Sequence, residues 1–109
     1  MDAMTLVQIK QKYDISRRAI QGYEKNGLVK STGKTKRGYL TYDEKSVQRI
    51  RDIKLYQEMG FQVKEIASVI DAPYEIKKIV LAEKRIELMK KKEKIILLID
   101  LLDQRMSKL

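Results

Sequence analysis

The C-terminal part of the chain constrains the fold most, because residues 74–109 contain neither glycine nor proline. Apolar side chains recur there at steps of three and four residues, the spacing of one face of an α-helix. This first stripe consists of Ile79, Ala82, Ile86, Met89, Ile96, Ile99 and Met106. A second stripe follows seven-residue steps through Leu81, Leu88, Ile95, Leu102 and Leu109. A helix with two apolar stripes needs protein partners, so we expect a dimerisation helix that forms a coiled coil.

The only proline marks the start of this helix. Pro73 follows Asp71 and Ala72, and the residue before a proline disfavours helical backbone. We therefore expect two parts, a domain over residues 1–70 and a linker with the dimerisation helix over residues 71–109.

Residues 1–70 carry the start and stop signals of four short helices. We expect these helices to run from Thr5 to about Lys12, from Ser16 to Gly27, from Asp43 to about Met59 and from about Gln62 to Ile70. The inner face of the fourth helix is predicted to carry Val63, Ile66, Ala67 and Ile70. Residues 31–39, S-T-G-K-T-K-R-G-Y, are polar and basic, and alternating residues follow them up to Tyr42. This pattern predicts a hairpin or a loop, which we call the wing. The predicted fold is mostly α, a winged helix-turn-helix domain followed by a long helix.

The charge of the chain indicates its class of partner. Its formal net charge is +9, which attracts polyanions such as nucleic acid. The chain has no cysteine and no histidine, and its carboxylates form no pattern of paired catalytic or ligating groups. We therefore expect no enzyme, no metal site and no cofactor. The first residues, M-D-A-M-T-L, do not resemble a signal peptide, and no apolar run is long enough to cross a bilayer, so we expect a cytoplasmic protein.

Two arginines occupy an unusual place in the second helix. Arg17 and Arg18 follow the predicted cap at Ser16, where the helix dipole disfavours cations by roughly 0.3–1 kcal/mol each. In a helix-turn-helix, the N-terminal residues of the second helix enter the major groove. The arginines are then well placed to contact phosphates or guanine edges, with Gln21 as a further reader of bases. The wing adds Lys34, Lys36, Arg37 and Tyr39 to the same basic surface.

Three strings then resemble one family. They are S-R-R-A-I-Q-G-Y-E-K-N-G-L, R-G-Y-L-T-Y-D-E and Y-Q-E-M-G-F-Q-V-K-E-I, and together they resemble the MerR family of bacterial transcription regulators over about residues 4–70. The resemblance implies a homodimer joined by an antiparallel coiled coil. It also implies binding to a pseudo-palindromic promoter whose spacer is bent and underwound, with an effect on RNA polymerase exerted through the DNA.

The resemblance also assigns roles to single residues. Arg18 matches the basic residue of the family's recognition helix, and Tyr23 matches the second of its two paired tyrosines. Arg37 and Tyr39 match residues of the wing that contact DNA. Lys54 matches a basic position on the third helix that reaches the DNA backbone. Three residues depart from the family pattern, because Gln21 replaces an arginine, Gly22 the first paired tyrosine and Leu40 an arginine. The predicted DNA-binding set is therefore Ser16, Arg17, Arg18, Gln21, Tyr23, Lys36, Arg37, Tyr39 and Lys54.

Several alternatives remain open at the level of sequence. Tyr23 lies near the inward face, where a core role competes with a phosphate contact, and Lys54 fits a solvated cation as well as a DNA contact. The whole chain also fits a DNA-architectural protein of the excisionase type, or an adaptor whose basic face binds an acidic protein. The sequence does not identify an effector, although a small-molecule pocket lined by Tyr56, Phe61 or Tyr74 is one hypothesis.

Overall fold

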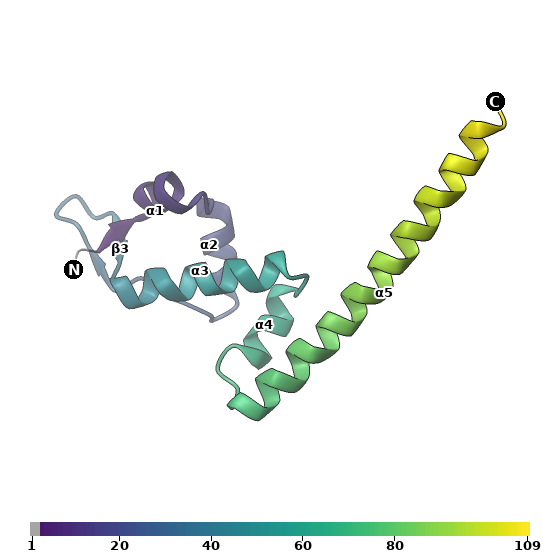
Figure 1. Ribbon diagram of the computed structural model, residues 1–109. Helices are drawn as coiled ribbons and strands as arrows, with labels where there is room; N and C mark the ends of the chain where they lie inside the picture. Colours follow the sequence, from purple (N-terminus) through teal and green to yellow (C-terminus); the bar gives the residue numbers. More distant parts are fainter. Residues whose placement is uncertain (1–2) are drawn as a thin grey trace. The chain divides into compact units, whose positions relative to one another are not determined.

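The computed structural model describes residues 3–109. Met1 and Asp2 lie outside the described residues, although they belong to the expected first domain and to the N-terminal stretch that does not resemble a signal peptide. The chain forms two compact units divided between Ala72 and Pro73 (Figure 1). Each unit is described by itself below, as the N-terminal unit and the C-terminal unit.

Local capping groups define the first two helices of the N-terminal unit. At the start of α1 (Leu6–Tyr13), the Thr5 backbone N–H donates to Gln8 Oε1 (2.9 Å) and the Gln8 N–H donates to Thr5 Oγ1 (3.3 Å), so the two residues form a capping box. The helix ends at Asp14, whose φ of 56° is left-handed. Aspartate tolerates this conformation better than most residues, and the turn passes directly into α2 (Arg17–Lys25).

Two further helices complete the helical part of this unit. Asp43 accepts a hydrogen bond from the Ser46 N–H (2.8 Å) and caps α3 (Glu44–Glu58), which buries Val47, Ile50 and Ile53. The fourth helix, α4 (Val63–Val69), buries Ile66 and Val69. Ile66 and Ile70 are buried as predicted, but the predicted inner position of Ala67 is wrong, because that side chain is exposed and Val69 is buried instead.

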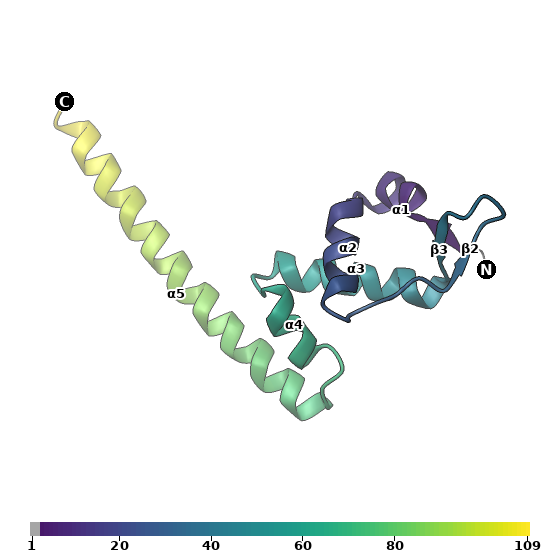
Figure 2. The same cartoon turned by 180° about the vertical axis from the view of Figure 1, so that it is seen from behind.

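A small antiparallel sheet forms the wing. Strand β2 (Gly33–Lys34) pairs with β3 (Leu40–Tyr42) in the register Gly33↔Thr41 and Lys34↔Leu40. Strand β1 (Met4–Thr5), which was not predicted, pairs with the other edge of β3, so that β3 is central (Figure 2). The strand that leads into α1 is thereby attached to the strand that leads into α3.

The N-terminal unit has one apolar core to which all four helices contribute. Its fully enclosed side chains include Ile9 from α1, Ile20 and Tyr23 from α2, Ile50 and Ile53 from α3 and Ile66 from α4. The rings of Tyr56 and Phe61 also pack together, with centroids 5.5 Å apart. In both views of the ribbon α2 crosses α3 (Figures 1 and 2), which leaves the other side of α2 facing solvent.

The C-terminal unit is one uninterrupted helix, α5 (Tyr74–Ser107), of 34 residues. At about 1.5 Å per residue it is roughly 50 Å long. The larger residues of the first stripe are exposed, from 41% at Met89 to 66% at Met106. A winged helix-turn-helix followed by a long helix confirms the predicted fold class. No helix within residues 3–109 has the length and the apolar character that crossing a membrane requires.

Candidate nucleic-acid interface

Both ends of α2 are tightly defined. Ser16 Oγ accepts a hydrogen bond from the Ala19 N–H (3.0 Å) at the start. At the end, the Leu28 N–H donates to the Tyr23 carbonyl (3.0 Å) around Gly27, whose φ is +73°, and this pairing is a Schellman stop. The predicted cap and stop are therefore confirmed, and they fix which side chains of α2 face outward.

The outward face of α2 carries the predicted recognition residues. Ile20 and Tyr23 are buried, so the opposite side of the helix presents Arg18, Gln21 and Gly22. Arg17, Arg18 and Gln21 are exposed, and no hydrogen bond or ion pair joins these three side chains to any part of residues 3–109. Two cations thus stand without counter-charge at the positive end of a helix dipole, an arrangement that favours an external anion.

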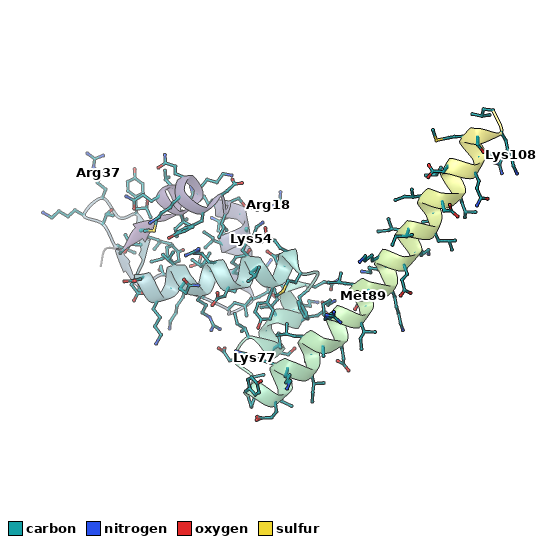
Figure 3. The ribbon with its side chains drawn as sticks, viewed as in Figure 1. Arg18, Arg37, Lys54, Lys77, Met89 and Lys108 are labelled. Atoms are coloured by element: carbon teal, nitrogen blue, oxygen red, sulfur yellow. The ribbon has the colours of Figure 1, made fainter. Side chains whose placement is uncertain are left out.

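The wing presents further cations on a well-formed turn. The Gly38 N–H donates to the Thr35 carbonyl (2.9 Å), and the φ of +87° at Gly38 allows the chain to reverse there. Lys36 and Arg37 are the central residues of this turn, and Arg37 points away from the unit (Figure 3). Tyr39 follows with 62% of its side chain exposed. Leu40, one of the departures from the family pattern, is 36% exposed.

A buried tyrosine holds the wing against α2. The hydroxyl of Tyr42, at the end of β3, donates to Glu24 Oε2 (3.0 Å). Burial, with the Glu24 hydrogen bond and charge, raises the pKa of Tyr42, and the nearby charge of Arg17 opposes this shift. Because Glu24 lies in the last turn of α2, this hydrogen bond joins the C-terminal end of α2 to the end of β3.

Tyr23 lies in the core. Its side chain is 1% exposed, and its hydroxyl donates to Gln57 Oε1 of α3 (2.6 Å). This is the core alternative that the sequence left open, so in the described structure Tyr23 joins α2 to α3 and does not offer its hydroxyl to a phosphate. Burial, followed by the charge of Glu58, raises its pKa.

Lys54 lies on α3, away from the wing. It is partly buried, and its charge contributes to lowering the pKa of Asp14, after the hydrogen bond and charge of Lys10. This places Lys54 beside the turn between α1 and α2. In the view of Figure 3, Arg18 and Lys54 are drawn close together, and Arg37 lies apart from both, at the wing.

Sequence reasoning missed Arg49 on α3. Its guanidinium forms a two-point ion pair with Asp71 (2.8 and 2.9 Å), and its Nε–H donates to the Leu28 carbonyl just after α2. It thus joins the segments that follow α2 and α4. The sequence contains no short-range signal for this contact, because Arg49 lies 21 and 22 residues from its two partners.

Comparison with known proteins places this geometry in a family. Residues 4–72 match the family described as MerR HTH family regulatory protein. The chain belongs to the MerR family. Its helix-turn-helix is accordingly the DNA-binding domain of a MerR-family transcription regulator, and the resemblance drawn from the three sequence strings is confirmed.

Individual MerR-family proteins are similar to the chain over most of its length. It is 30% identical over 100 residues to the HTH-type transcriptional activator mta of Bacillus subtilis, covering 89% of this chain but 39% of that relative. The structure of MtaN, the N-terminus of the B. subtilis multidrug transporter activator, matches with a TM-score of 0.75 and 26% identity over 94% of this chain and 97% of that one. HiNmlR, a MerR family regulator lacking the sensor domain and bound to promoter DNA, matches with a TM-score of 0.70 and 19% identity over 97% and 89% of the two chains.

Proposed function

We propose that this protein binds a pseudo-palindromic promoter site as a homodimer and regulates transcription in the cytoplasm by distorting the DNA. The observation that carries the proposal is the pair of uncompensated arginines, Arg17 and Arg18, at the exposed start of a capped helix. Such a helix terminus is suited to the major groove, where arginine recognises guanine and glutamine recognises adenine.

The roles follow from where each side chain lies. Arg18 and Gln21, on the outward face of α2, read base edges, and Arg17 contacts phosphate. Ser16 Oγ already accepts the Ala19 N–H, but its hydroxyl hydrogen remains free to donate to a phosphate oxygen. Lys36, Arg37 and Tyr39 extend from the wing to the neighbouring backbone, and Lys54 meets the backbone near the turn between α1 and α2. The packed ring of Tyr23 holds the recognition helix against the core.

The exposed first stripe of α5 supports the homodimer. We assign the interface to Ile79, Ala82, Ile86, Met89, Ile96, Ile99 and Met106, in an antiparallel coiled coil. Exposed apolar stripes of this length are covered by a second helix in soluble proteins. A two-fold dimer presents two recognition helices at a fixed separation, which matches a site with two half-sites.

The effect on transcription belongs to the same proposal. The DNA-bound HiNmlR structure is of a MerR-family regulator on a promoter, and its fold is shared by this chain. We infer a comparable docking in which the DNA between the half-sites is bent and underwound, so that RNA polymerase is affected through the DNA. We assign no effector.

Selection of genomic fragments by the purified protein tests the proposal. We expect enrichment of one sequence with two inverted half-sites. Its affinity should fall steeply with salt while exceeding that of a scrambled duplex of the same length. An architectural protein would bind both duplexes with similar affinity. An adaptor for acidic proteins would enrich no sequence, and either result would contradict the proposal.

A further inference from the structure

Gly22 lies in the middle of α2, where glycine is unfavourable. Apart from proline, glycine is the poorest helix former, because its backbone loses the most freedom on folding. Gly22 is not at a helix end and does not adopt a left-handed conformation. Some other factor must offset its cost.

The other glycines each have a reason within the chain. Positive φ values account for Gly27, Gly38 and Gly60. At Gly33 an added Cβ would lie 3.0 Å from Thr41 Oγ1. At Gly22 an added Cβ would meet no described atom within 4 Å. Neither backbone conformation nor internal packing therefore requires glycine at this position.

The position of Gly22 indicates what requires it. It lies one turn after Arg18 and beside Gln21, on the face opposite the buried Ile20 and Tyr23. Its carbonyl accepts the Asn26 side-chain N–H (2.8 Å), an interaction that any residue at this position would retain. The Cα of Gly22 is thus an open point on the proposed recognition face.

We propose that Gly22 is a positioning residue for DNA, because its missing side chain lets the helix backbone approach the duplex closely. Glycine serves this purpose wherever a backbone must contact a ligand, and a Cα–H can then contact a phosphate or base oxygen. The close approach brings Arg18 and Gln21 within reach of the bases. This inference rests on the proposed function and adds a steric requirement to it.

The substitution Gly22→Ala tests the inference, because it should raise the thermal stability of the protein and lower its affinity for DNA. Alanine restores helix propensity, so Tm should rise by roughly 4–8 °C in a domain of this size. Affinity for the duplex enriched from genomic fragments should fall by at least about fivefold, and Gly22→Leu should lower it further. Both quantities are measured on the full chain at one protein concentration and one salt concentration.

Ser68→Ala on α4 is the matched control. Ser68 is exposed and lies outside the proposed interface, so alanine there should raise Tm slightly without changing affinity. An unchanged or higher affinity of Gly22→Ala would overturn the inference, as would a lower Tm, which would show that the chain itself requires the glycine. If the wild-type protein prefers no duplex, the proposed function fails together with the inference. If the wild type is selective and Gly22→Ala binds as it does, only the inference fails.

Discussion

At the residue scale, we expect Arg18 to read a base pair and Arg37 to contact the DNA backbone. Arg18 lies on the outward face of α2, whereas Arg37 lies at the tip of the wing. Arg18→Ala should weaken binding to the selected duplex by about 1–3 kcal/mol and relax the preference at one base pair of each half-site. Arg37→Ala should weaken all duplexes alike and reduce the salt slope by about 1. Titrations against the selected duplex and its single-base variants, at several salt concentrations, measure both effects, and identical behaviour of the two variants would contradict the assignment.

The buried hydroxyl of Tyr23 gives a second prediction at this scale. Tyr23→Phe removes the hydrogen bond to Gln57 and keeps the packed ring. We expect the free energy of unfolding to fall by about 0.5–1.5 kcal/mol, with unchanged affinity for DNA. Chemical denaturation and DNA titration of the same preparation measure the two quantities. A loss of affinity without a loss of stability would instead place the hydroxyl on a phosphate.

At the element scale, the start of α3 makes stability depend on pH. The hydrogen bond from the Ser46 N–H lowers the pKa of Asp43 below its usual range. A carboxyl whose pKa is lower in the folded state stabilises the fold above its unfolded pKa, and this contribution is lost as pH falls through the folded value. We therefore expect part of the decline in Tm below about pH 4 to come from this cap.

Two substitutions at Asp43 separate its charge from its hydrogen bond. Asp43→Asn retains an oxygen that accepts the Ser46 N–H but does not titrate, so Tm should decline less steeply below about pH 4 than in the wild type. Asp43→Ala removes the acceptor and should lower Tm across the whole range. Thermal melts from pH 2.5 to 7 provide the comparison, and parallel curves for the wild type and Asp43→Asn would show that the cap does not titrate as we expect.

At the scale of the whole molecule, the exposed first stripe of α5 is expected to hold two copies together. Ile86 is 56% exposed, and burying a side chain of this type contributes roughly 1.5–3 kcal/mol. Ile86→Asp replaces that gain with a buried, unpaired charge. We expect a monomer by sedimentation and a loss of preference for paired over single half-sites. Lys90→Gln changes the net charge by the same amount outside this stripe and should remain dimeric, and a dimeric Ile86→Asp variant would contradict the assignment.

Much of the helical framework could be predicted because its signals are local. The cap at Ser16, the stop at Gly27 and the cap at Asp43 each depend on atoms within a few residues. The outward position of Arg18 then follows from the helical period and from the burial of Ile20. The resemblance to the MerR family rested on strings that include the same capped segments.

The remaining features depend on contacts between distant parts of the chain. The pairing of Met4 with Tyr42 creates β1, and Arg49 reaches Leu28 and Asp71. A two-residue strand has no periodicity to detect, and a charged pair more than 20 residues apart has no spacing rule. The choice of Val69 over Ala67 for the core likewise depended on what α4 packs against.

The amino-acid sequence by itself determined where the helices begin and end and which of them carries uncompensated cations, because capping and helix dipoles act within a turn or two of the chain. Only the tertiary structure decided that the Tyr23 hydroxyl binds Gln57, that Tyr42 ties the wing to α2 and that the space beside Gly22 is empty. The physical reason is that each of these facts depends on which surfaces meet once the chain has collapsed.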